Sequence, residues 1–248
     1  MEKEMKQTIF KIKENIALTD SVYKMTLSGD TSEITAPGQF VNIKLEGLYL
    51  RRPISVCDCE GDTLTLIYKV VGRGTEQMKA MTEGKLDILT GLGNGYDTEL
   101  SGERPLLIGG GVGVPPLYML ARKLIAEGKK VTVILGFNTR NEIFCEDDFK
   151  KLGAEVIVTT VDGSYGIKGF VTNAMEGLDY SHFYCCGPEP MLKAVHRVST
   201  TDGQLSFEER MGCGFGACMG CSCKTLTGYK RICKDGPVMM KGEITWEK

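Results

Sequence analysis

Four cysteines near the C-terminus have the spacing of iron–sulfur ligands. Cys213, Cys218, Cys221 and Cys233 follow the pattern C-x4-C-x2-C-x11-C, which is the ligand spacing of a plant-type [2Fe-2S] cluster. Glycines at positions 212, 214, 216 and 220 allow the loop to take positive φ angles and to bring main-chain N–H groups close to sulfur. The spacing therefore predicts a [2Fe-2S] cluster and electron transfer one electron at a time.

A structural zinc site is the main alternative, because four thiolates also suit tetrahedral zinc. Zinc knuckles usually contain two C-x2-C pairs, however, and here only Cys218 and Cys221 form one. A disulfide framework is less favoured, since residues 1–13 are charged rather than apolar and so lack the features of a signal peptide. This predicts the reducing cytoplasm. Cys223, two residues after Cys221, fits the ligand pattern worse and is expected to be a neighbouring thiol, with substitution for a ligand as the alternative.

Composition narrows the class of protein. The chain has 248 residues, of which 42% are hydrophobic and 25% charged, with a formal net charge of −2. This balance does not suggest a nucleic-acid partner. The longest stretch without charge, residues 105–121, contains a run of glycines and two prolines, so no membrane span is expected.

The pattern of elements changes twice along the chain. Residues 1–101 contain short alternating runs, such as 22–27, 40–45 and 63–71, separated by turn residues, which predicts an antiparallel barrel or sandwich. In residues 102–203, apolar runs alternate with helical patterns, which predicts a parallel sheet with helices on its faces. Residues 204–248 carry the cysteines and are expected to contain little regular structure and little core of their own.

Two motifs in the first segment suit phosphate groups. Arg52 and Ser55 lie in the run LRRPIS at the end of a predicted strand. The arginine can pair with a pyrophosphate and the serine can bond a flavin ring, although Arg51 and Arg52 could equally be solvated. Gly72, Gly74 and Thr75 open a short predicted helix whose N-terminus attracts anions. A plain glycine turn with a threonine cap explains them as well.

A glycine loop and a C-G-P turn mark the second segment. Gly111 and Gly113 lie in the run GGGVGVPP between a buried strand and a helix, where they allow a phosphate close to the main chain. Cys186 and Gly187 follow a later strand. Because ligands bind at the carboxyl ends of parallel strands, these residues are expected beside the glycine loop. Two small buried residues are the alternative for Cys185 and Cys186.

Together these motifs resemble the ferredoxin–NADP reductase superfamily, which has R-x-x-S, G-x-G-T, a glycine loop and C-G-P in this order. The stretch EERMGCGFGACMGC at 208–221, with CKDGPV at 233–238, is similar to the electron-transfer subunits of NAD-linked dihydroorotate dehydrogenases. The resemblance spans nearly the whole chain. It implies a multi-domain β and α/β architecture with an antiparallel flavin-binding β-barrel (1–101), a parallel-sheet pyridine-nucleotide domain (102–203) and a small [2Fe-2S] module (204–248).

The resemblance also implies a role for individual residues. The residues expected to bind FAD, its pyrophosphate included, are Arg52, Pro53, Ile54, Ser55, Lys69, Gly72, Gly74 and Thr75. Those expected to contact NAD are Gly111, Gly113, Cys186, Gly187 and Pro188, and the cluster ligands are Cys213, Cys218, Cys221 and Cys233. One departure from the family is the pair Pro53 and Ile54, where relatives often have an aromatic residue.

The activity that this resemblance implies is that of an oxidoreductase subunit in pyrimidine biosynthesis. FAD would exchange hydride with NAD(H), and the cluster would relay single electrons to an FMN-containing partner that oxidises dihydroorotate, in a heterotetramer. The length leaves no room for a substrate-oxidising domain of about 250 residues. A single arginine, Arg140, follows the strand at 131–135, which favours NAD over NADP.

Two other functions remain open. The same flavin and cluster could serve the small subunit of an NAD(P)H-linked ferredoxin reductase, transhydrogenase or sulfide dehydrogenase complex. A reading of a different class is a zinc-stabilised binding module on a degenerate reductase fold, which predicts a colourless protein that contains zinc.

Overall fold

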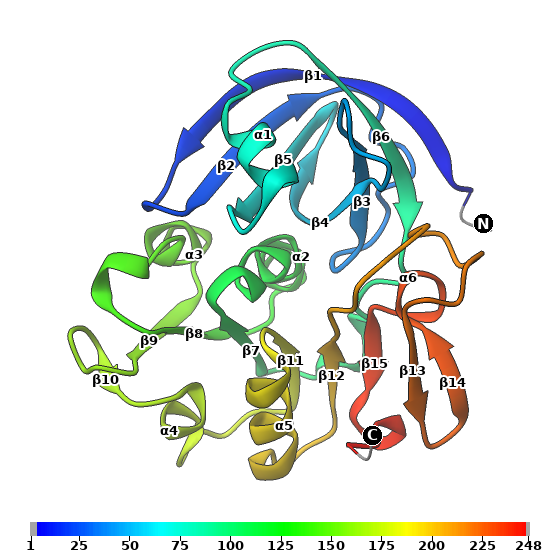
Figure 1. The fold of residues 1–248 in the computed structure, drawn as a ribbon. Coiled ribbons are helices and arrows are strands. Elements are labelled where there is room, and N and C mark those ends of the chain that lie inside the picture. The colour runs from blue at the N-terminus through cyan, green and yellow to red at the C-terminus, as the bar shows by residue number, and fades with distance from the viewer. Residues whose placement is uncertain (1–3, 247–248) are drawn as a thin grey trace.

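The N-terminal part of the chain folds into a closed antiparallel β-barrel, drawn at the top of Figure 1. The computed structural model describes residues 4–246. Side chains alternate between the inside and outside of a barrel, and Phe10, Met25 and Leu66 are fully buried inside this one. The strands pair in the order β1-β2-β5-β4-β3-β6. Their bounds are β1 Lys6–Ala17, β2 Val22–Ser28, β3 Phe40–Lys44, β4 Arg52–Glu60, β5 Thr63–Lys69 and β6 Lys85–Leu92, with helix α1 Arg73–Lys79 after β5.

A second sheet of seven strands lies below the barrel in Figure 1. Its order is β10-β9-β8-β7-β11-β12-β15, and all neighbours are parallel except β12 and β15. Parallel strands are buried on both faces and are therefore mostly apolar. Every residue of β7 and β11 is buried, and His182 is their only strongly polar side chain. The bounds are β7 Pro105–Gly110, β8 Thr132–Phe137, β9 Glu155–Thr160, β10 Ile167–Lys168, β11 His182–Cys186, β12 Gly203–Ser206 and β15 Val238–Met240.

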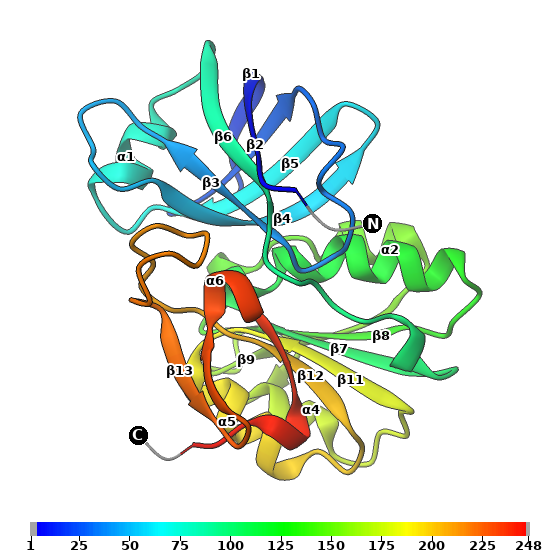
Figure 2. The ribbon, with the colours of Figure 1, turned by 90° about the vertical axis from the view of Figure 1, so that its right-hand side faces the viewer.

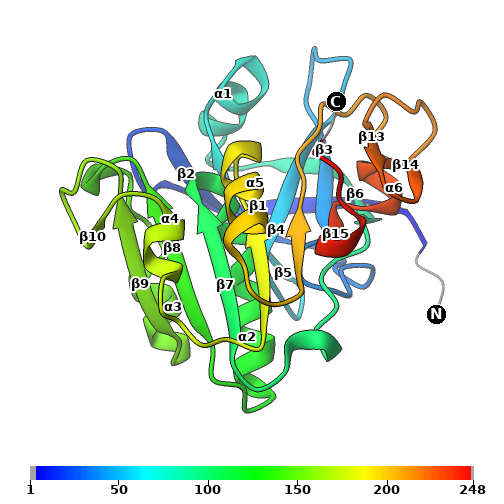
Figure 3. The ribbon, with the colours of Figure 1, turned by 90° about the horizontal axis from the view of Figure 1, so that it is seen from below.

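Helices cover both faces of this sheet. On β7, Leu107 packs into one core with α2 and α3, whereas Leu106 and Ile108 pack into another with α4 and α5; Figure 3 shows α4 and α5 on one face. The helices are α2 Tyr118–Ala126, α3 Glu146–Leu152, α4 Val171–Met175 and α5 Glu189–Val198, and short 3-10 turns occupy Glu99–Ser101, Gly111–Gly113, Pro115–Leu117, Arg140–Glu142 and Lys241–Glu243.

The cysteine-bearing segment contains more regular structure than the sequence predicts. It forms a hairpin of β13 (Ser222–Thr225) and β14 (Gly228–Arg231), a one-turn helix α6 (Ile232–Asp235), and β15, which extends the large sheet. Its core is shared, because Ile232 and Cys233 pack in one cluster with Phe40 and Leu89 of the barrel. Figure 2 shows the segment against both the barrel and the sheet. A chain this short gains its burial from its neighbours.

The barrel and the large sheet are joined by specific contacts. Arg122 of α2 donates to the Asp58 carboxylate at 2.7 Å and to the Cys59 carbonyl oxygen at 2.9 Å, both on β4. Tyr96, in the linker after β6, donates its hydroxyl to the Cys185 carbonyl oxygen at 3.3 Å. The first contact fixes the end of β4 against helix α2, and the second fixes the linker after β6 against β11.

The predicted architecture of barrel, parallel sheet and C-terminal module is confirmed. One local expectation is wrong, because Arg52 begins strand β4 instead of ending a strand. The preceding strand stops at Lys44, and residues 45–51 turn before Arg52 pairs with Ile43. Among the described residues, no helix combines the length and hydropathy that a membrane crossing requires.

Candidate functional site

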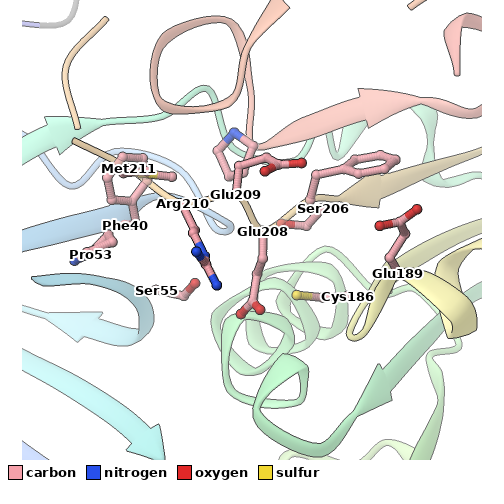
Figure 4. Close-up of a pocket in the computed structure, with 12 residues that line it drawn as sticks. Phe40, Pro53, Ser55, Cys186, Glu189, Ser206, Glu208, Glu209, Arg210 and Met211 are labelled. Carbon is pink, nitrogen blue, oxygen red and sulfur yellow. The ribbon is translucent and has the colours of Figure 1, made fainter. Parts of the chain in front are cut away.

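Three parts of the chain meet around a cleft of about 490 Å³. Strands β3 and β4 form one wall, the ends of β11 and β12 form another, and residues 207–211 lead from β12 toward the cysteines. Figure 4 shows Ser55 and Cys186 on opposite walls, with Glu208 between them. This volume suits a large organic cofactor. The lining residues are Phe40, Pro53, Ser55, Cys186, Glu189, Ser206, Phe207, Glu208, Glu209, Arg210, Met211 and Pro237.

The glycine turn before α1 lies against Arg52. Thr75 Oγ1 accepts hydrogen bonds from the main-chain N–H groups of Val71 at 2.9 Å and Gly72 at 3.2 Å, which fixes the turn. A Cβ atom at Gly74 would overlap the Arg52 side chain. The two motifs predicted to hold a pyrophosphate are therefore neighbours, although about 20 residues separate them in the chain.

The two adjacent arginines of this motif differ in their partners. Arg51 forms an ion pair with Asp87 at 2.9 Å and donates to two main-chain carbonyl oxygens. Arg52 has no carboxylate partner in the part of the chain that the structure describes, and it bonds the carbonyl oxygen of Leu50 at 2.6 Å. A guanidinium group without a carboxylate beside a helix N-terminus suits a phosphate. Arg51, in contrast, stabilises the barrel.

The remaining predicted flavin residues divide between cleft and barrel. Pro53 and Ser55 line the cleft. Ile54 packs against the barrel core, because successive side chains on a strand point to opposite faces. Lys69 is exposed at the end of β5, away from the cleft lining.

The glycine loop and the C-G-P turn lie side by side, as the sequence predicts. Cys186 on β11 is paired with Gly109 on β7. A Cβ atom at Gly113 would overlap the carbonyl oxygen of Cys186, whereas one at Gly111 would meet nothing within 4 Å. Gly113 thus allows close packing of the loop on β11, and Gly111, with φ of 53°, adopts a left-handed conformation that favours glycine.

The turn after β11 combines a buried thiol with an exposed proline. Gly187 is buried, and Pro188 is exposed at the N-terminus of α5. Burial raises the pKa of the Cys186 thiol to about 12, and the Glu208 carboxylate adds to the shift, so that the thiol is neutral near pH 7. Burial also raises the pKa of Glu208. The cleft therefore contains two groups that bind protons more tightly than they do in water.

The four predicted cluster ligands form two pairs. Cys221 Sγ lies 3.2 Å from Cys233 Sγ. The main-chain N–H of Cys213 points to Cys218 Sγ at 3.5 Å, and that of Cys218 points to Cys213 Sγ at 3.4 Å. Within residues 4–246, no group of three or more His, Cys, Asp or Glu side chains is placed to hold one metal ion. Two pairs suit a centre with two iron atoms better than one tetrahedral zinc ion.

The loop around the first ligand fits a thiolate-bound cluster. Although burial alone would raise it, hydrogen bonds from the N–H groups of Phe215 and Cys218 lower the pKa of the Cys213 thiol to about 6, and the thiolate is the form that binds iron. Cβ atoms at Gly212 and Gly220 would lie 3.2 and 3.5 Å from Cys218 Sγ. Glycine therefore keeps space beside this sulfur.

Cys223 lies outside the two pairs. It is half-buried on β13 opposite Lys230 and packs against the core that the module shares with the barrel. None of the hydrogen bonds among the described residues links its sulfur to those of the four predicted ligands. This geometry does not favour Cys223 as a replacement for one of the four predicted ligands.

Several residues of the site carry no local signal that sequence reasoning could use. Phe40 belongs to an ordinary apolar strand, and only the fold brings it to the cleft. Glu208 and Arg210 lie in the stretch that carries the family resemblance, but their spacing alone assigned them no role. In Figure 4 both side chains extend into the cleft between Ser55 and Cys186.

Two family models match the chain. Residues 208–245 match the iron-sulfur cluster binding domain of dihydroorotate dehydrogenase B. Residues 107–197 match the oxidoreductase NAD-binding domain. The first covers all four paired cysteines, and the second covers the glycine loop and the C-G-P turn.

Curated relatives match nearly from end to end. One from Fusobacterium nucleatum is 44% identical over 95% of this chain and 97% of its own length. One from a Geobacillus species is 43% identical over 97% of this chain and 99% of its own length. Both are named dihydroorotate dehydrogenase B (NAD(+)), electron transfer subunit.

Solved structures share the fold. A chain from an NADH-dependent reduced ferredoxin-NADP oxidoreductase, described for flavin-based electron bifurcation, superposes with a TM-score of 0.86 at 29% identity and covers 96% of this chain and 90% of that one. A ferredoxin NADP+ reductase from Neisseria gonorrhoeae, solved with FAD and NADP, gives a TM-score of 0.68 at 19% identity, covering 78% of this chain and 90% of that one. The second likeness concerns the fold alone.

Proposed function

Because this chain belongs to the family of dihydroorotate dehydrogenase B electron transfer subunits, we propose that it carries electrons between a dihydroorotate-oxidising partner and NAD. It is an oxidoreductase subunit with an iron–sulfur domain and an NAD-binding domain. The direction that we propose runs from the partner through the cluster and FAD to NAD.

The observation that carries this proposal is the continuity of the cleft with the cysteine loop. Residues 207–211 close the third side of the cleft and run directly into the first ligand, Cys213. Bound FAD supplies the conversion between hydride transfer to nicotinamide and one-electron transfer to the cluster. A cofactor in this cleft would therefore have the nucleotide loops on one side and the cysteines on the other.

The cleft and the segments next to it have separate tasks in this proposal. Arg52 and the turn at Gly72, Gly74 and Thr75 would hold the pyrophosphate of FAD by charge and main-chain N–H groups. Ser55 would bond the flavin ring, with Pro53 beside it. The buried, neutral Cys186 thiol would exclude water from the reacting face, and the Glu208 carboxyl group, whose pKa is raised, would hold a proton beside it. We further propose that NAD contacts Gly111, Gly113, Gly187 and Pro188. The proposed cluster ligands are Cys213, Cys218, Cys221 and Cys233. FAD binding by Ile54 and Lys69 is supported by the resemblance alone.

The cysteine loop offers a surface for the partner. Phe215 and Met219 are 43% and 56% exposed on either side of Cys218, which is itself exposed. Large apolar side chains at such exposure are typical of protein interfaces. We propose that an FMN-containing dihydroorotate-oxidising subunit covers this surface in a heterotetramer, so that electrons enter through a short path.

We propose the domain limits 1–101, 102–203 and 204–248, supported by the barrel ending at Leu92 and the sheet beginning at Pro105. A cytoplasmic location is also part of the proposal. It is supported by the ten cysteines of the chain, all of which are free thiols in the structure, as expected in a reducing compartment.

The test combines this chain with an FMN-containing dihydroorotate-oxidising subunit. Anaerobic mixing with dihydroorotate and NAD+ should produce orotate and NADH in equal amounts, while neither protein alone should couple the two reactions. A Cys218→Ser variant is the matched control, because it removes one exposed ligand and leaves the cleft intact. Absence of coupling between two proteins that carry their full flavin and iron would contradict the proposal.

A second candidate function is supported by the 29% identity to the bifurcating NADH-dependent oxidoreductase chain. In that case this chain would serve a ferredoxin-linked partner instead. The same mixing experiment separates the two, since a ferredoxin-linked subunit would accept electrons from reduced ferredoxin and pass them to the nicotinamide, and would not support orotate formation.

A further inference from the structure

A buried asparagine of the barrel contacts the first predicted cluster ligand. Asn42, in the middle of β3, is 1% exposed. Its Nδ2 atom donates a hydrogen bond to the carbonyl oxygen of Cys213 at 3.1 Å, across 171 positions of sequence. A Cβ atom at Gly214 would overlap the same amide nitrogen. The chain thus leaves room for this amide directly at the start of the cysteine loop.

The same asparagine lies beside the wall of the cleft. In the ladder between β3 and β4, Asn42 is opposite Pro53, and Phe40 is opposite Ser55. Phe40, Pro53 and Ser55 all line the cleft. Phe40 and Asn42 point out of the barrel, because their neighbours Val41 and Ile43 fill its core. Asn42 therefore spans the distance between the proposed flavin wall and the cluster loop.

An amide at this position does not serve stability alone. Asn42 Oδ1 is buried without a hydrogen-bond partner in the described part of the chain, and an unpaired buried polar atom destabilises a fold. A leucine of similar size would fill the space without that cost. The role of the amide therefore lies in its hydrogen bond to the Cys213 carbonyl oxygen.

We propose that Asn42 is a positioning residue for electron transfer, which holds the Cys213 side of the cluster against the flavin wall and raises the reduction potential of the cluster. This inference rests on the proposed function. The bond ends at the Cys213 carbonyl oxygen and not at its sulfur, so its effect on the potential is electrostatic. The positive N–H end of the buried amide dipole lies at the ligand loop, where it favours the reduced cluster with its additional negative charge. Burial by β3 strengthens the effect, because it removes competing water.

The experiment compares the loaded wild-type chain with Asn42→Leu. Iron and FAD contents are measured first, and the midpoint potential is then determined by titration followed with electron paramagnetic resonance. We expect full iron and FAD, a shift of the potential to more negative values, and electron transfer from FAD to the cluster slowed by about fivefold, as for the loss of one hydrogen bond. Reduction of FAD by NADH, which does not involve the cysteine loop, is the internal reference.

Asn94→Leu is the matched control. Asn94 also ties the barrel to the module, since its Nδ2 donates to the Val238 carbonyl oxygen at 2.7 Å and its Oδ1 accepts the Val238 N–H at 3.1 Å. These two bonds end at Val238 and not at a predicted cluster ligand. An equal shift of potential in this control would show that loose docking is the cause, and would overturn the inference. Gly214→Ala, which must displace the amide from the other side, should shift the potential in the same direction as Asn42→Leu.

Two further outcomes contradict the inference. An unchanged potential and an unchanged rate in Asn42→Leu would mean that the hydrogen bond has no influence on the cluster. Loss of iron with FAD retained would mean that Asn42 is needed to assemble the cluster rather than to adjust it. The proposed function fails separately, since wild-type protein without iron or without coupling to dihydroorotate oxidation would contradict it whatever Asn42 does.

Discussion

Glu208 is the residue whose chemistry depends most on its surroundings. Its carboxylate stands beside the neutral Cys186 thiol in a cleft between three parts of the chain, and burial raises its pKa. A carboxyl group with a raised pKa exchanges protons closer to neutral pH than it does in water. Hydride exchange at a flavin is accompanied by proton uptake or release, and in the proposed function Glu208 would be the group that exchanges this proton.

The raised pKa of Glu208 predicts a pH-dependent effect of Glu208→Gln on stability. The folded state binds this proton more tightly than the unfolded state, so its contribution is fully present below the unfolded pKa and is lost as pH rises through the folded pKa. At pH values above that range the wild type bears the cost of a carboxylate that the cleft desolvates in part, although its side chain is exposed, and the variant does not. Thermal unfolding from about pH 5 to pH 8 should show the variant gaining stability relative to wild type as pH rises. A constant difference across this range would contradict the shifted pKa.

Substitutions at Arg52 are expected to change the affinity for FAD. Because its guanidinium has no carboxylate partner among the described residues and lies on the turn at Gly74, Arg52→Ala should weaken FAD binding by about 10- to 100-fold, the effect of losing hydrogen bonds to a charged group. Iron content should not change. Arg52→Lys should be intermediate, since it keeps the charge and loses the planar fork. Flavin fluorescence titration of the apoproteins measures the FAD affinity of the wild type and of both variants. Equal affinities would exclude a pyrophosphate contact.

In the loop from β7 to α2, two positions of one motif require glycine for different structural reasons. Gly113 is needed because the loop packs directly on the end of β11, and Gly111 because its φ is 53°. The first reason involves a strand about 70 residues away in the chain, and the second is local. A glycine pattern in the sequence does not distinguish them.

The two glycines therefore predict different losses. Gly113→Ala must move the loop away from the Cys186 carbonyl oxygen and should cost about 1–3 kcal/mol of unfolding free energy, with weaker binding of NADH. Gly111→Ala, whose Cβ meets open space, should cost about 1 kcal/mol and is the matched control for the stability measurement. Denaturant unfolding and NADH titration give both quantities. A larger loss of stability in Gly111→Ala would contradict the packing role of Gly113.

Local patterns predicted most elements because they need only neighbouring residues. The strand-like runs at 22–27, 40–45 and 63–71 and the strand at 131–135 are visible in the sequence, and the structure confirms them as β2, β3, β5 and β8 within a few residues. What the sequence could not reveal are contacts between distant segments. Asn42 and Cys213 are 171 positions apart, and nothing in the run FVNIK distinguishes an asparagine that bonds a cysteine loop from one in a turn. The pairing of the four sulfurs and the shared core under the module are of the same kind.

At the scale of the whole molecule, the cysteine module is part of a common core. Phe40 and Leu89 of the barrel, Leu205 of the sheet, and Ile232 and Cys233 of the module all belong to one buried cluster. The expectation of a separate module with little core of its own is therefore only half right, since its apolar residues are buried against both other parts. Substitution of a cluster ligand that lies in this core should consequently affect the stability of the whole chain as well as the loop.

This shared core makes two ligands of the same cluster unequal. Cys218 is exposed, whereas Cys221 is 2% exposed inside the common core. Both Cys218→Ser and Cys221→Ser should abolish the iron signal in electron paramagnetic resonance, because each removes a ligand. Only Cys221→Ser also buries a hydroxyl group among apolar side chains, which should cost about 1–3 kcal/mol and lower its melting temperature by roughly 5 °C relative to Cys218→Ser.

FAD should remain bound in both variants, because the cleft walls at Ser55 and the turn at Thr75 contain no cluster ligand. Iron analysis, flavin absorbance and a melting curve on the same samples measure the cluster content, the FAD content and the stability of both variants. Equal melting temperatures would mean that the core under the module tolerates a polar atom. Loss of FAD from Cys221→Ser alone would mean that the core transmits the damage to the cleft. Loss of FAD from Cys218→Ser as well would show that the cluster itself holds the barrel and the parallel sheet in the arrangement that binds flavin.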